Sequence, residues 1–532
     1  MSNEPTKSPT PTAGPSATRR GFMKGVGVGG LAVAGSSFPI FNIASAQQKN
    51  LTYALFGEPA GLNEFLYTEI HGGVVTTNIY NKMARMNYDT LQVEPELVEW
   101  KMIDPLTWQL KVREGVKWHK GYGELTAEDV EYVFNYIQES NASPKGTAHF
   151  MVDGAKAIGK YAVEVKLKTP FSPFAMVTLE YGGNMMCKAA HKEMGDQAYA
   201  RNPIGTGPFV FDEWVSGSHI VLKKNAEYWR PDQPHVDEVL YRVIEDPGVR
   251  LSSLLTGEID IMPRPDPKDI ARFRDGNEPG IKYQSVAGWN WDYMDFTFPP
   301  HIDAAFPTVK ADVRKAISYA IDRQAIVDEI YAGEALVTDN PVPPGYLSHR
   351  DSPIVYPASG DIEKAKELMA KAGVGSFDLE VIPSDKEWLR RECELVAAML
   401  SEIGINMTIK SSDVGTYSTA WVQNKFQADL EDITIVSPDV DSALWWFHHK
   451  DGLVEHGWNN EEVSAWLDEG RVETDPEKRT GLYHKIVDAV LEDCPYIYIA
   501  HVNQVYLTKE GIQGFEATPQ EHIVPLWNVS WA

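Results

Sequence analysis

The sequence predicts an α/β protein that folds as two lobes, the first richer in strands than the second. Three observations support this fold class. The chain has 532 residues, which is more than one hydrophobic core serves. Helical and strand-like segments alternate between residues 361 and 409, as in a sheet covered by helices. Segments before residue 215 instead show the two-residue alternation of half-buried strands.

In the first half, the expected strands are Leu51–Phe56, Trp108–Arg113, Ala162–Leu167 and Phe209–Trp214. Trp108–Arg113 and Ala162–Leu167 alternate apolar and polar residues, as half-buried strands do. A helix should begin at Thr126, because Thr126 and Asp129 come close to a capping box and an apolar stripe follows. Asn202–Pro208 contains two glycines and two prolines, so it should form a loop.

Amphipathic helices dominate the second half. The expected helices are Asp312–Tyr331, Asp361–Lys371 and Glu387–Ile403, and the expected strands are Phe377–Ile382 and Ile405–Ile409. Gly333 and Gly373 follow the first two helices. Glycine is the usual residue just past a helix, so it should end both of them.

Residues 1–46 are similar to an export signal. The segment Arg19-Arg20-Gly21-Phe22-Met23-Lys24 precedes a Gly-rich, mildly apolar run, and Ala44-Ser45-Ala46 offers a small-residue cleavage pattern. The paired arginines resemble the twin-arginine signal, which implies a bacterial chain that is exported already folded. The glycines make the apolar run weak as a membrane-spanning helix. We therefore expect a periplasmic mature chain with no stable membrane insertion after signal cleavage.

The composition excludes several classes of protein. The formal net charge is −26, so the phosphate backbone of a nucleic acid should repel the chain. Hydrophobic residues make up 43% and charged residues 23%, as in soluble globular proteins. The three cysteines, Cys187, Cys393 and Cys494, are too few for a disulfide framework or a four-cysteine zinc site.

Motifs for catalysis and metal binding are missing from the sequence. There is no G-x-S-x-G or HExxH motif, and Gly205-Thr206-Gly207 lacks the lysine of a phosphate-binding loop. His448, His449 and His456 lack the helical spacing of metal ligands. Paired carboxylates would suit a glycosidase, but 75 acidic residues give no basis for choosing a pair. We expect a protein without enzymatic activity, cofactor or metal.

Two aromatic clusters are candidates for a ligand-binding surface. They are Trp289-Asn290-Trp291-Asp292 and Trp445-Trp446. Large rings bury a ligand with little loss of side-chain entropy, and the neighbouring amide and carboxylate would orient it. The alternative is that the tryptophans belong to the hydrophobic core.

Four groups of motifs occur in a fixed order along the chain. They are Asp104-Pro105 with Trp108, Val112–His119 and Leu125–Val130; Asn202–Phe209 with Trp214, Asn225, Tyr228 and Trp229; Leu255–Asp260; and Val313–Arg323. Behind an export signal, this series resembles the extracellular solute-binding proteins of family 5, the dipeptide- and oligopeptide-binding components of ABC importers. The resemblance covers nearly all of the mature chain.

The resemblance implies a two-lobed periplasmic-binding-protein fold of the cluster C type, with the chain crossing between the lobes twice. We expect lobe I at residues 47–283 with a C-terminal return at 504–532, and lobe II at residues 284–503. An extra subdomain of lobe I should span about residues 88–200. The protein should be a monomer.

The resemblance also implies candidate ligand-binding residues. The family holds a ligand amine with an aspartate, and the matching stretch, Ile433–Asp441, offers Asp439 and Asp441 but lacks the family's Gly-Trp pair. Arg390 or Arg391 falls where the family places a carboxylate-binding arginine. Glu69 and His71 lie in a segment that matches a pocket-lining loop.

The resemblance implies a protein that captures a small solute between its lobes and delivers it to the permease subunits of an ABC importer. The expected solute is a short peptide, an amino-acid derivative or an opine-like compound. The tryptophan pairs leave an oligosaccharide open as a second ligand class. Two further hypotheses are a carboxylate-dependent hydrolase and a receptor that docks to a membrane sensor.

Overall fold

The computed structural model describes residues 50–532, apart from residues 68, 140–145, 436, 438, 453 and 455. The expected export signal, with Arg19, Arg20 and the pattern Ala44–Ala46, lies outside the described residues. Within the described part of the chain, no helix is long and apolar enough to cross a membrane.

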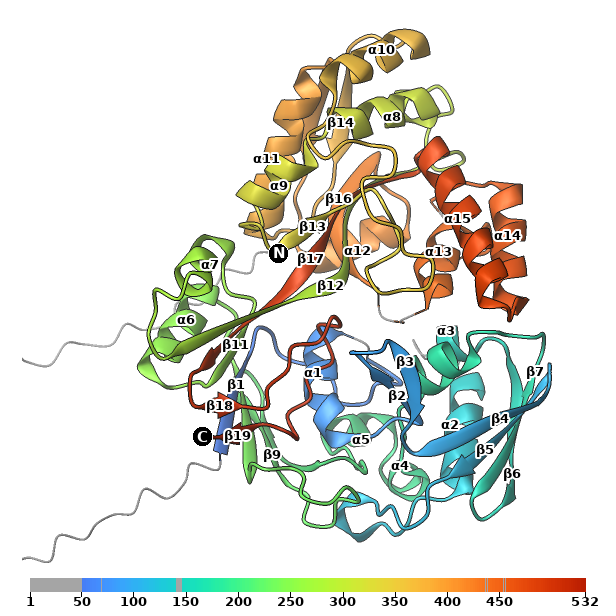
Figure 1. The fold of residues 1–532 in the computed structure, drawn as a ribbon, viewed down its shortest axis with the longest axis vertical. Helices are drawn as coiled ribbons and strands as arrows, with labels where there is room; N and C mark the ends of the chain where they lie inside the picture. The colour runs from blue at the N-terminus through green and yellow to red at the C-terminus, as the bar shows by residue number, and fades with distance from the viewer. Residues whose placement is uncertain are drawn as a thin grey trace, which may run out of the picture. The chain divides into compact units, whose positions relative to one another are not determined.

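One large mixed sheet runs through the described chain (Figure 1). In spatial order its strands are β15 (Ile405–Ile409), β14 (Phe377–Val381), β16 (Ala428–Thr434), β12 (Ile281–Phe296), β17 (Tyr496–Lys509), β11 (Ile261–Pro263), β1 (Asn50–Leu55), β10 (Glu238–Val243), β9 (His219–Lys224) and β8 (Phe209–Val215). Strand β13 (Ala335–Val337) also pairs with β17. Strand β1 is parallel to β10, and β14 is parallel to β15 and β16, whereas β12 and β17 are antiparallel. The predicted α/β class is confirmed.

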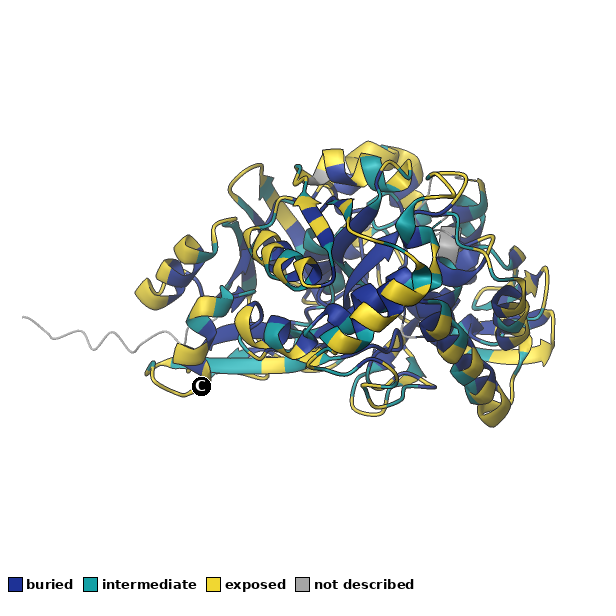
Figure 2. Cartoon of the chain, turned by 90° about the horizontal axis from the view of Figure 1, so that it is seen from above, coloured by how far each residue is buried: buried dark blue, intermediate teal, exposed yellow. Residues whose placement is uncertain are grey.

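Buried hydrophobic side chains form two large cores, which we call the cores of lobe I and lobe II. The core of lobe I draws on residues between 51 and 261 and between 506 and 529, and that of lobe II on residues between 289 and 500. Strands β12 and β17 run from one core to the other, so the chain passes between them twice. Figure 2 shows the strands largely buried and the outer faces of the helices exposed. The expected lobe boundaries fall inside these two strands and stay predictions.

Lobe I contains a second, four-stranded sheet near the position expected for the extra subdomain. Its antiparallel order is β4 (Val98–Asp104), β5 (Thr107–Val112), β7 (Ala162–Leu167) and β6 (Val152–Gly159). Helix α2 (Ala127–Glu139) buries its apolar stripe, as its sequence predicts. The remaining short elements nearby are the hairpin β2 (Ala84–Asn87) and β3 (Gln92–Pro95), the 3-10 turn η1 (His119–Gly121), α3 (Gly146–His149), the π-helix η2 (Phe174–Tyr181), α4 (Lys188–Met194) and α5 (Asp196–Arg201).

The other elements of lobe I bring distant parts of the chain to one place. They are α1 (Ile70–Ile79), α6 (Pro247–Thr256), α7 (Pro267–Arg274) and the small pair β18 (Ile512–Gln513) and β19 (Ser530–Trp531). The C-terminal segment lies against α1, where the Asn78 amide donates to the carbonyl of Val524 at 2.8 Å. The last residues of the chain are therefore part of lobe I.

Helices cover the sheet of lobe II. They are α8 (Ala311–Ala320), α9 (Arg323–Glu329), α10 (Ile362–Ala372), α11 (Glu387–Ser401), α12 (Val414–Val422), α13 (Val440–His448), α14 (Glu461–Val472) and α15 (Pro476–Asp493), after the 3-10 turn η3 (Pro307–Val309). Helices α10 and α11 and strands β14 and β15 confirm the predictions for residues 361–409.

The prediction of one continuous helix over Asp312–Tyr331 is wrong. The structure has two helices there, because Ile321 is extended (φ −77°, ψ 117°). Asp322 then caps a new helix, since its side chain accepts a hydrogen bond from the backbone N–H of Ala325. The apolar spacing continues through the break, so periodicity alone does not reveal it.

Candidate functional site

A cavity of about 550 Å³ lies between the two lobes. Three kinds of segment line it: the end of β1 with α6 and the start of α7 in lobe I, the start of α11 with β16 in lobe II, and the strands β12 and β17 that connect the lobes. Its volume falls within the range of small-molecule sites. We call it the interlobe cavity.

The lobe II wall carries a lysine between two carboxylates. Lys386 Nζ lies 2.5 Å from Glu431 Oε1 and 2.5 Å from Asp432 Oδ1. Burial raises the pKa of Asp432, but the charges of Lys386 and Arg264 outweigh it and leave the pKa below its ordinary value. Asp432 is therefore a carboxylate at neutral pH, and this wall presents both signs of charge. The ring of Trp388 lies beside the ammonium, 5.4 Å from it.

On the lobe I wall, an arginine is held by a carboxylate from the C-terminal segment. Arg264 donates through Nε and Nη2 to both oxygens of Glu521, a bidentate ion pair. Its guanidinium also lies over the ring of Phe56, 4.7 Å from the centroid. The Glu521 and Asp432 carboxylates both act on Arg264 and help to hold its pKa above the ordinary value, although its burial opposes this. Charges of the two lobes thus meet across the cavity.

His71 does not line the cavity itself but packs against Phe56, which does. Its imidazole packs edge-on against Phe56, with the ring centroids 4.6 Å apart. Burial, and then the nearby charge of Arg264, lower the pKa of His71 to about 4. His71 is therefore neutral at physiological pH and contributes ring packing rather than charge. Its predicted contact with a ligand stays a prediction.

Asn290 is the residue of the first aromatic cluster that lines the interlobe cavity. Its Oδ1 accepts a hydrogen bond from Gln504 Nε2 at 3.4 Å, which holds the amide at the strand pair connecting the lobes. Asp292, two residues on, is fully buried against Tyr331 and Glu392. Burial raises the pKa of Asp292 to about 7, so this carboxyl is partly protonated near neutral pH. Tyr331 itself lines the cavity, so the buried pair lies directly behind its wall.

The two tryptophans of that cluster lie in the core of lobe II. Trp289 and Trp291 are each 1% exposed. Trp289 packs edge-on against Tyr346 at 4.8 Å, and Trp291 packs against Tyr498 at 5.1 Å between ring centroids. Neither ring lines the interlobe cavity as the structure has it, so their part in ligand binding stays a prediction.

Glu69 and Arg390 make local contacts in this structure. Glu69 caps helix α1, with its carboxylate accepting from the backbone N–H groups of Ala60 at 2.8 Å and Gly72 at 2.6 Å. Arg390 pairs with Glu394 one turn along α11 at 3.0 Å. The neighbouring Arg391 is the arginine of α11 that lines the cavity. Ligand contacts of Glu69 and Arg390 stay predictions.

The second candidate group lies around α13. Asp439 accepts two hydrogen bonds from Arg479, at 2.6 and 2.9 Å, and Asp441 accepts two from Arg471, at 2.8 and 3.1 Å. All four side chains are buried. These aspartates are thus already neutralised within lobe II, and none of the four lines the interlobe cavity.

The rings of α13 lie where lobe II contacts lobe I. The Arg471 guanidinium lies 3.5 Å from the Trp445 ring centroid, and Trp445 stacks on Phe150 of lobe I at 6.0 Å. Trp446 packs against Tyr181 of lobe I at 6.3 Å. The cluster therefore contributes to the interlobe contact, and its binding of a ligand stays a prediction.

Sequence reasoning missed the charged residues of the cavity. Lys386 lies four positions before Arg390, at the start of the helix where a carboxylate-binding residue is expected, and the binding of a carboxylate there stays a prediction. Arg264 and Glu521 are 257 positions apart in the sequence, and no local pattern connects them. The one available signal was the start of α11, where Lys386, Trp388 and Arg391 share one end of a helix.

The comparisons with known proteins agree with this architecture. The sequence model of the bacterial extracellular solute-binding proteins, family 5, matches residues 92–453. The chain belongs to this family. The predicted family and the predicted class of function, a solute-binding protein, are therefore confirmed.

Relatives and solved structures match over nearly the whole chain. The dipeptide-binding protein of Escherichia coli is 27% identical over 90% of this chain and 94% of its own length. Di/tripeptide-binding protein 1 of Pseudomonas aeruginosa is 26% identical over 90% of this chain and 93% of its own. A periplasmic binding protein of Helicobacter pylori, solved with the peptide STSA, has a TM-score of 0.78 and 23% identity, covering 91% of this chain and 98% of that one. The predicted two-lobed fold is confirmed.

Proposed function

We propose that this family member is a periplasmic binding protein that takes up a short peptide or an amino-acid derivative, opine-like compounds included, in the interlobe cavity. It delivers this solute to the permease subunits of an ABC importer without changing it chemically. It works as a monomer and needs no cofactor. Two relatives named for binding dipeptides or tripeptides, each matching about nine-tenths of this chain, support the ligand class.

The observation that carries the proposal is the charge pattern of the interlobe cavity. Lobe II offers Lys386 and Asp432, and lobe I offers Arg264. A peptide or amino acid is a zwitterion, so its carboxylate would join Lys386 or Arg264 and its ammonium would join Asp432, each in competition with the ion-pair partner that the side chain already has. Apolar side chains such as Phe56 and Trp388 share the lining with these polar groups, a combination that is typical of small-molecule sites. Closure of the lobes would exclude water and strengthen these contacts.

No observation favours the remaining candidate functions. The oligosaccharide hypothesis was based on the tryptophan pairs, and Trp289 and Trp291 pack in the core of lobe II. The hydrolase hypothesis needs two carboxyls that reach a substrate, whereas the closely packed pair Asp292 and Glu392 is 0% exposed.

Mass spectrometry of the solute that co-purifies with the mature protein identifies the ligand directly. Calorimetry against a panel of dipeptides, tripeptides and free amino acids then measures affinity. We expect Asp432→Asn and Lys386→Met each to weaken binding about 10- to 100-fold, because a charged contact in a closed cavity is lost. Lys410→Met is the matched control, since Lys410 forms an exposed ion pair with Glu380 on the far edge of the sheet.

Thermal unfolding of each variant separates lost binding from lost folding. If no peptide or amino acid gives heat and the co-purified solute is of another class, the proposed ligand is wrong. If Lys410→Met weakens binding as much as the cavity variants do, the interlobe cavity is not the binding site.

A further inference from the structure

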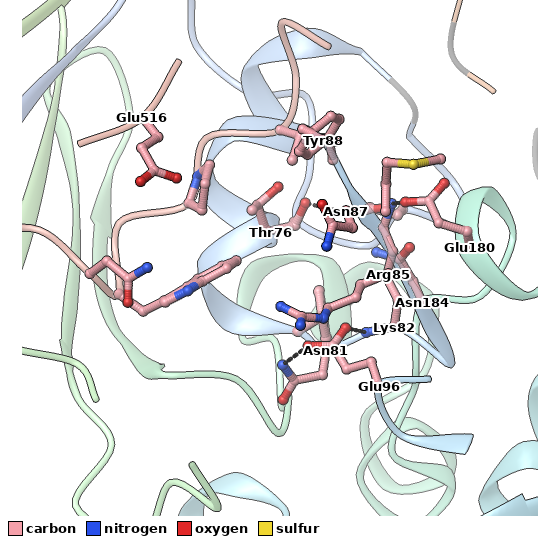
Figure 3. Close-up of a pocket in the computed structure, with 18 of the residues that line it drawn as sticks. Thr76, Asn81, Lys82, Arg85, Asn87, Tyr88, Glu96, Glu180, Asn184 and Glu516 are labelled. Carbon is pink, nitrogen blue, oxygen red and sulfur yellow. Dashed lines mark hydrogen bonds and ion pairs between the residues drawn. The ribbon is translucent and has the colours of Figure 1, made fainter. Parts of the chain in front are cut away.

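Lobe I contains a second cavity, of about 260 Å³, that shares no lining residue with the interlobe cavity. It lies between α1, the strand β2 and the C-terminal segment from Gly514 to Asn528 (Figure 3). We call it the lobe I cavity. The proposed solute-binding function does not use it.

The wall of this cavity is strongly acidic. Among the described residues, five carboxylates and two cationic side chains line it: Glu64, Asp89, Glu96, Glu180 and Glu516, with Lys82 and Arg85. Both cations are already paired, Lys82 with Glu180 at 2.7 Å and Arg85 with Glu94 at 2.8 Å, and Glu96 pairs with Arg230, which lies outside the lining, at 2.9 Å. Counted with these partners, acids still outnumber bases. The cavity therefore keeps an excess of negative charge.

Two buried oxygen atoms at the cavity lack a hydrogen-bond partner among the described residues. They are Oε2 of Glu180 and Oδ1 of Asn184, on side chains that are 2% and 3% exposed. A buried acceptor without a donor costs free energy that a bound donor recovers. The amide of Asn184 is a signal independent of the carboxylates, and in Figure 3 Glu180 extends from η2 towards the side chains of β2. A ligand that brings a hydrogen-bond donor within reach of either atom would recover that cost.

Lys82 shows that this environment stabilises an ammonium group. Burial lowers the pKa of Lys82, but Glu180, Glu64 and Glu96 outweigh it and leave the pKa above the ordinary value. One ammonium thus lies near three carboxylates, of which Glu96 also pairs with Arg230. A second positive charge would be accommodated by the same excess.

Aromatic rings complete the lining. Tyr80, Tyr88 and Trp527 line the cavity together with the carboxylates. The face of an aromatic ring attracts cations, and the combination of rings with acids is a common way to bind organic cations. We propose that the lobe I cavity binds a small organic cation carrying a primary ammonium or guanidinium group, separately from the solute of the interlobe cavity.

The test is calorimetry on the mature protein with putrescine and agmatine as probes. Butane-1,4-diol, which has the length of putrescine without its charge, and glutarate, which has the opposite charge, are the control probes. We expect binding of the two amines, weakening as salt is raised, and no heat from the diol or the acid. Hydrogen exchange should slow in residues 514–528 when putrescine is added, since these residues form one wall.

Variants locate the site. Glu180→Gln should weaken amine binding at least about 10-fold, because the charged acceptor is lost. Since this change also affects Lys82, Trp527→Ala serves as a second variant that leaves all carboxylates in place and should weaken binding as well. Glu245→Gln, which alters an acid of the interlobe cavity, is the matched control and should leave amine binding unchanged.

Two results would overturn the proposal directly: no binding of either amine, or binding of the diol as tight as that of putrescine. A third would be amine binding that is lost in Glu245→Gln or Asp432→Asn but is unchanged in Trp527→Ala. The last would place the amine in the interlobe cavity. Peptide binding in the interlobe cavity is a separate measurement, and Trp527→Ala should leave it unchanged. The two proposals therefore fail independently.

Discussion

At the scale of single residues, buried arginines determine what the aspartates of α13 do. Asp441 is held by two hydrogen bonds from Arg471, and the same guanidinium lies over the ring of Trp445. Asp439 is held in the same way by Arg479. Each carboxylate has its counter-charge within lobe II, so its first contribution is to the integrity of that lobe.

Arg471→Met tests this role. The variant leaves the carboxylate of Asp441 buried without a counter-charge, so we expect it to lower the free energy of unfolding by about 3–5 kcal/mol. Denaturation in urea, followed by tryptophan fluorescence, measures the change. Arg390→Met is the control, because the exposed pair of Arg390 with Glu394 should contribute less than about 1 kcal/mol.

The double variant Arg471→Met with Asp441→Leu makes the test specific. Removing both charges should recover part of the loss, because no unpaired charge remains. The single variant Asp441→Leu gives the cost of that change in the natural protein. If adding Asp441→Leu to Arg471→Met costs just as much, the two residues do not interact and the proposed role of Arg471 is wrong.

At the scale of elements, the loop Asn202–Pro208 shows why its glycines are needed. A Cβ atom on Gly205 would lie 1.9 Å from the carbonyl oxygen of Ile79, and one on Gly207 would lie 2.5 Å from it. The backbone N–H of Gly207 donates to that same oxygen at 2.9 Å. The loop therefore packs its backbone directly on the end of α1, a contact that only glycine permits.

Gly205→Ala should accordingly destabilise lobe I. The added methyl group must push the loop from α1, and we expect a loss of about 2 kcal/mol or more, as in other overpacked sites. Gly481→Ala is the matched control: Gly481 lies inside α15 with open space around its Cβ position, so alanine should stabilise the helix by about 0.5–1 kcal/mol. Chemical denaturation compares the two. A neutral Gly205→Ala would show that the loop moves aside freely.

The elements also show how far the sequence alone leads. Strong local signals give the right element, as at β7, β15 and α10, because alternation, caps and terminal glycines act over a few residues. The break at Asp322 was missed because its cap competes with an apolar spacing that continues. The sequence pointed to Asn290, which lines the cavity, but it did not point to Lys386, which lines it too. The pairing of Arg264 with Glu521 depends on the tertiary fold. The charged residues of a cavity are brought together by contacts between distant segments, which no local pattern encodes.

At the scale of the whole molecule, the acidity of the chain continues into the interior of lobe II. Four carboxyl groups are buried along β12, β16 and α11: Asp292, Glu392, Asp429 and Glu431. Burial is the main cause that raises the pKa of each of them. The folded protein therefore holds protons that the unfolded chain releases.

The sign of the resulting pH dependence follows from linkage. A carboxyl whose pKa is raised on folding contributes stability that is fully present below its unfolded pKa and is lost as pH rises through its folded pKa. For Asp292 that window runs from about pH 4 to about pH 7. Within this window, each rise of one pH unit removes at most about 1.4 kcal/mol of that contribution.

Asp292→Asn removes this contribution together with the part that Asp292 plays in raising the pKa of Glu392. The asparagine is neutral in both states and can donate to Glu392, so the variant should gain stability relative to the natural protein as pH rises from 5 to 8. Urea denaturation at each pH gives the difference between the two proteins, with Glu380→Gln on the exposed edge as the control. A difference that is the same at pH 5 and pH 8 would mean that Asp292 is already ionised in the folded state, stabilised by a counter-charge. A difference that grows with pH would instead tie the stability of lobe II to protons held directly behind the interlobe cavity, through Tyr331, which lines the cavity and donates to Glu392 at 3.2 Å.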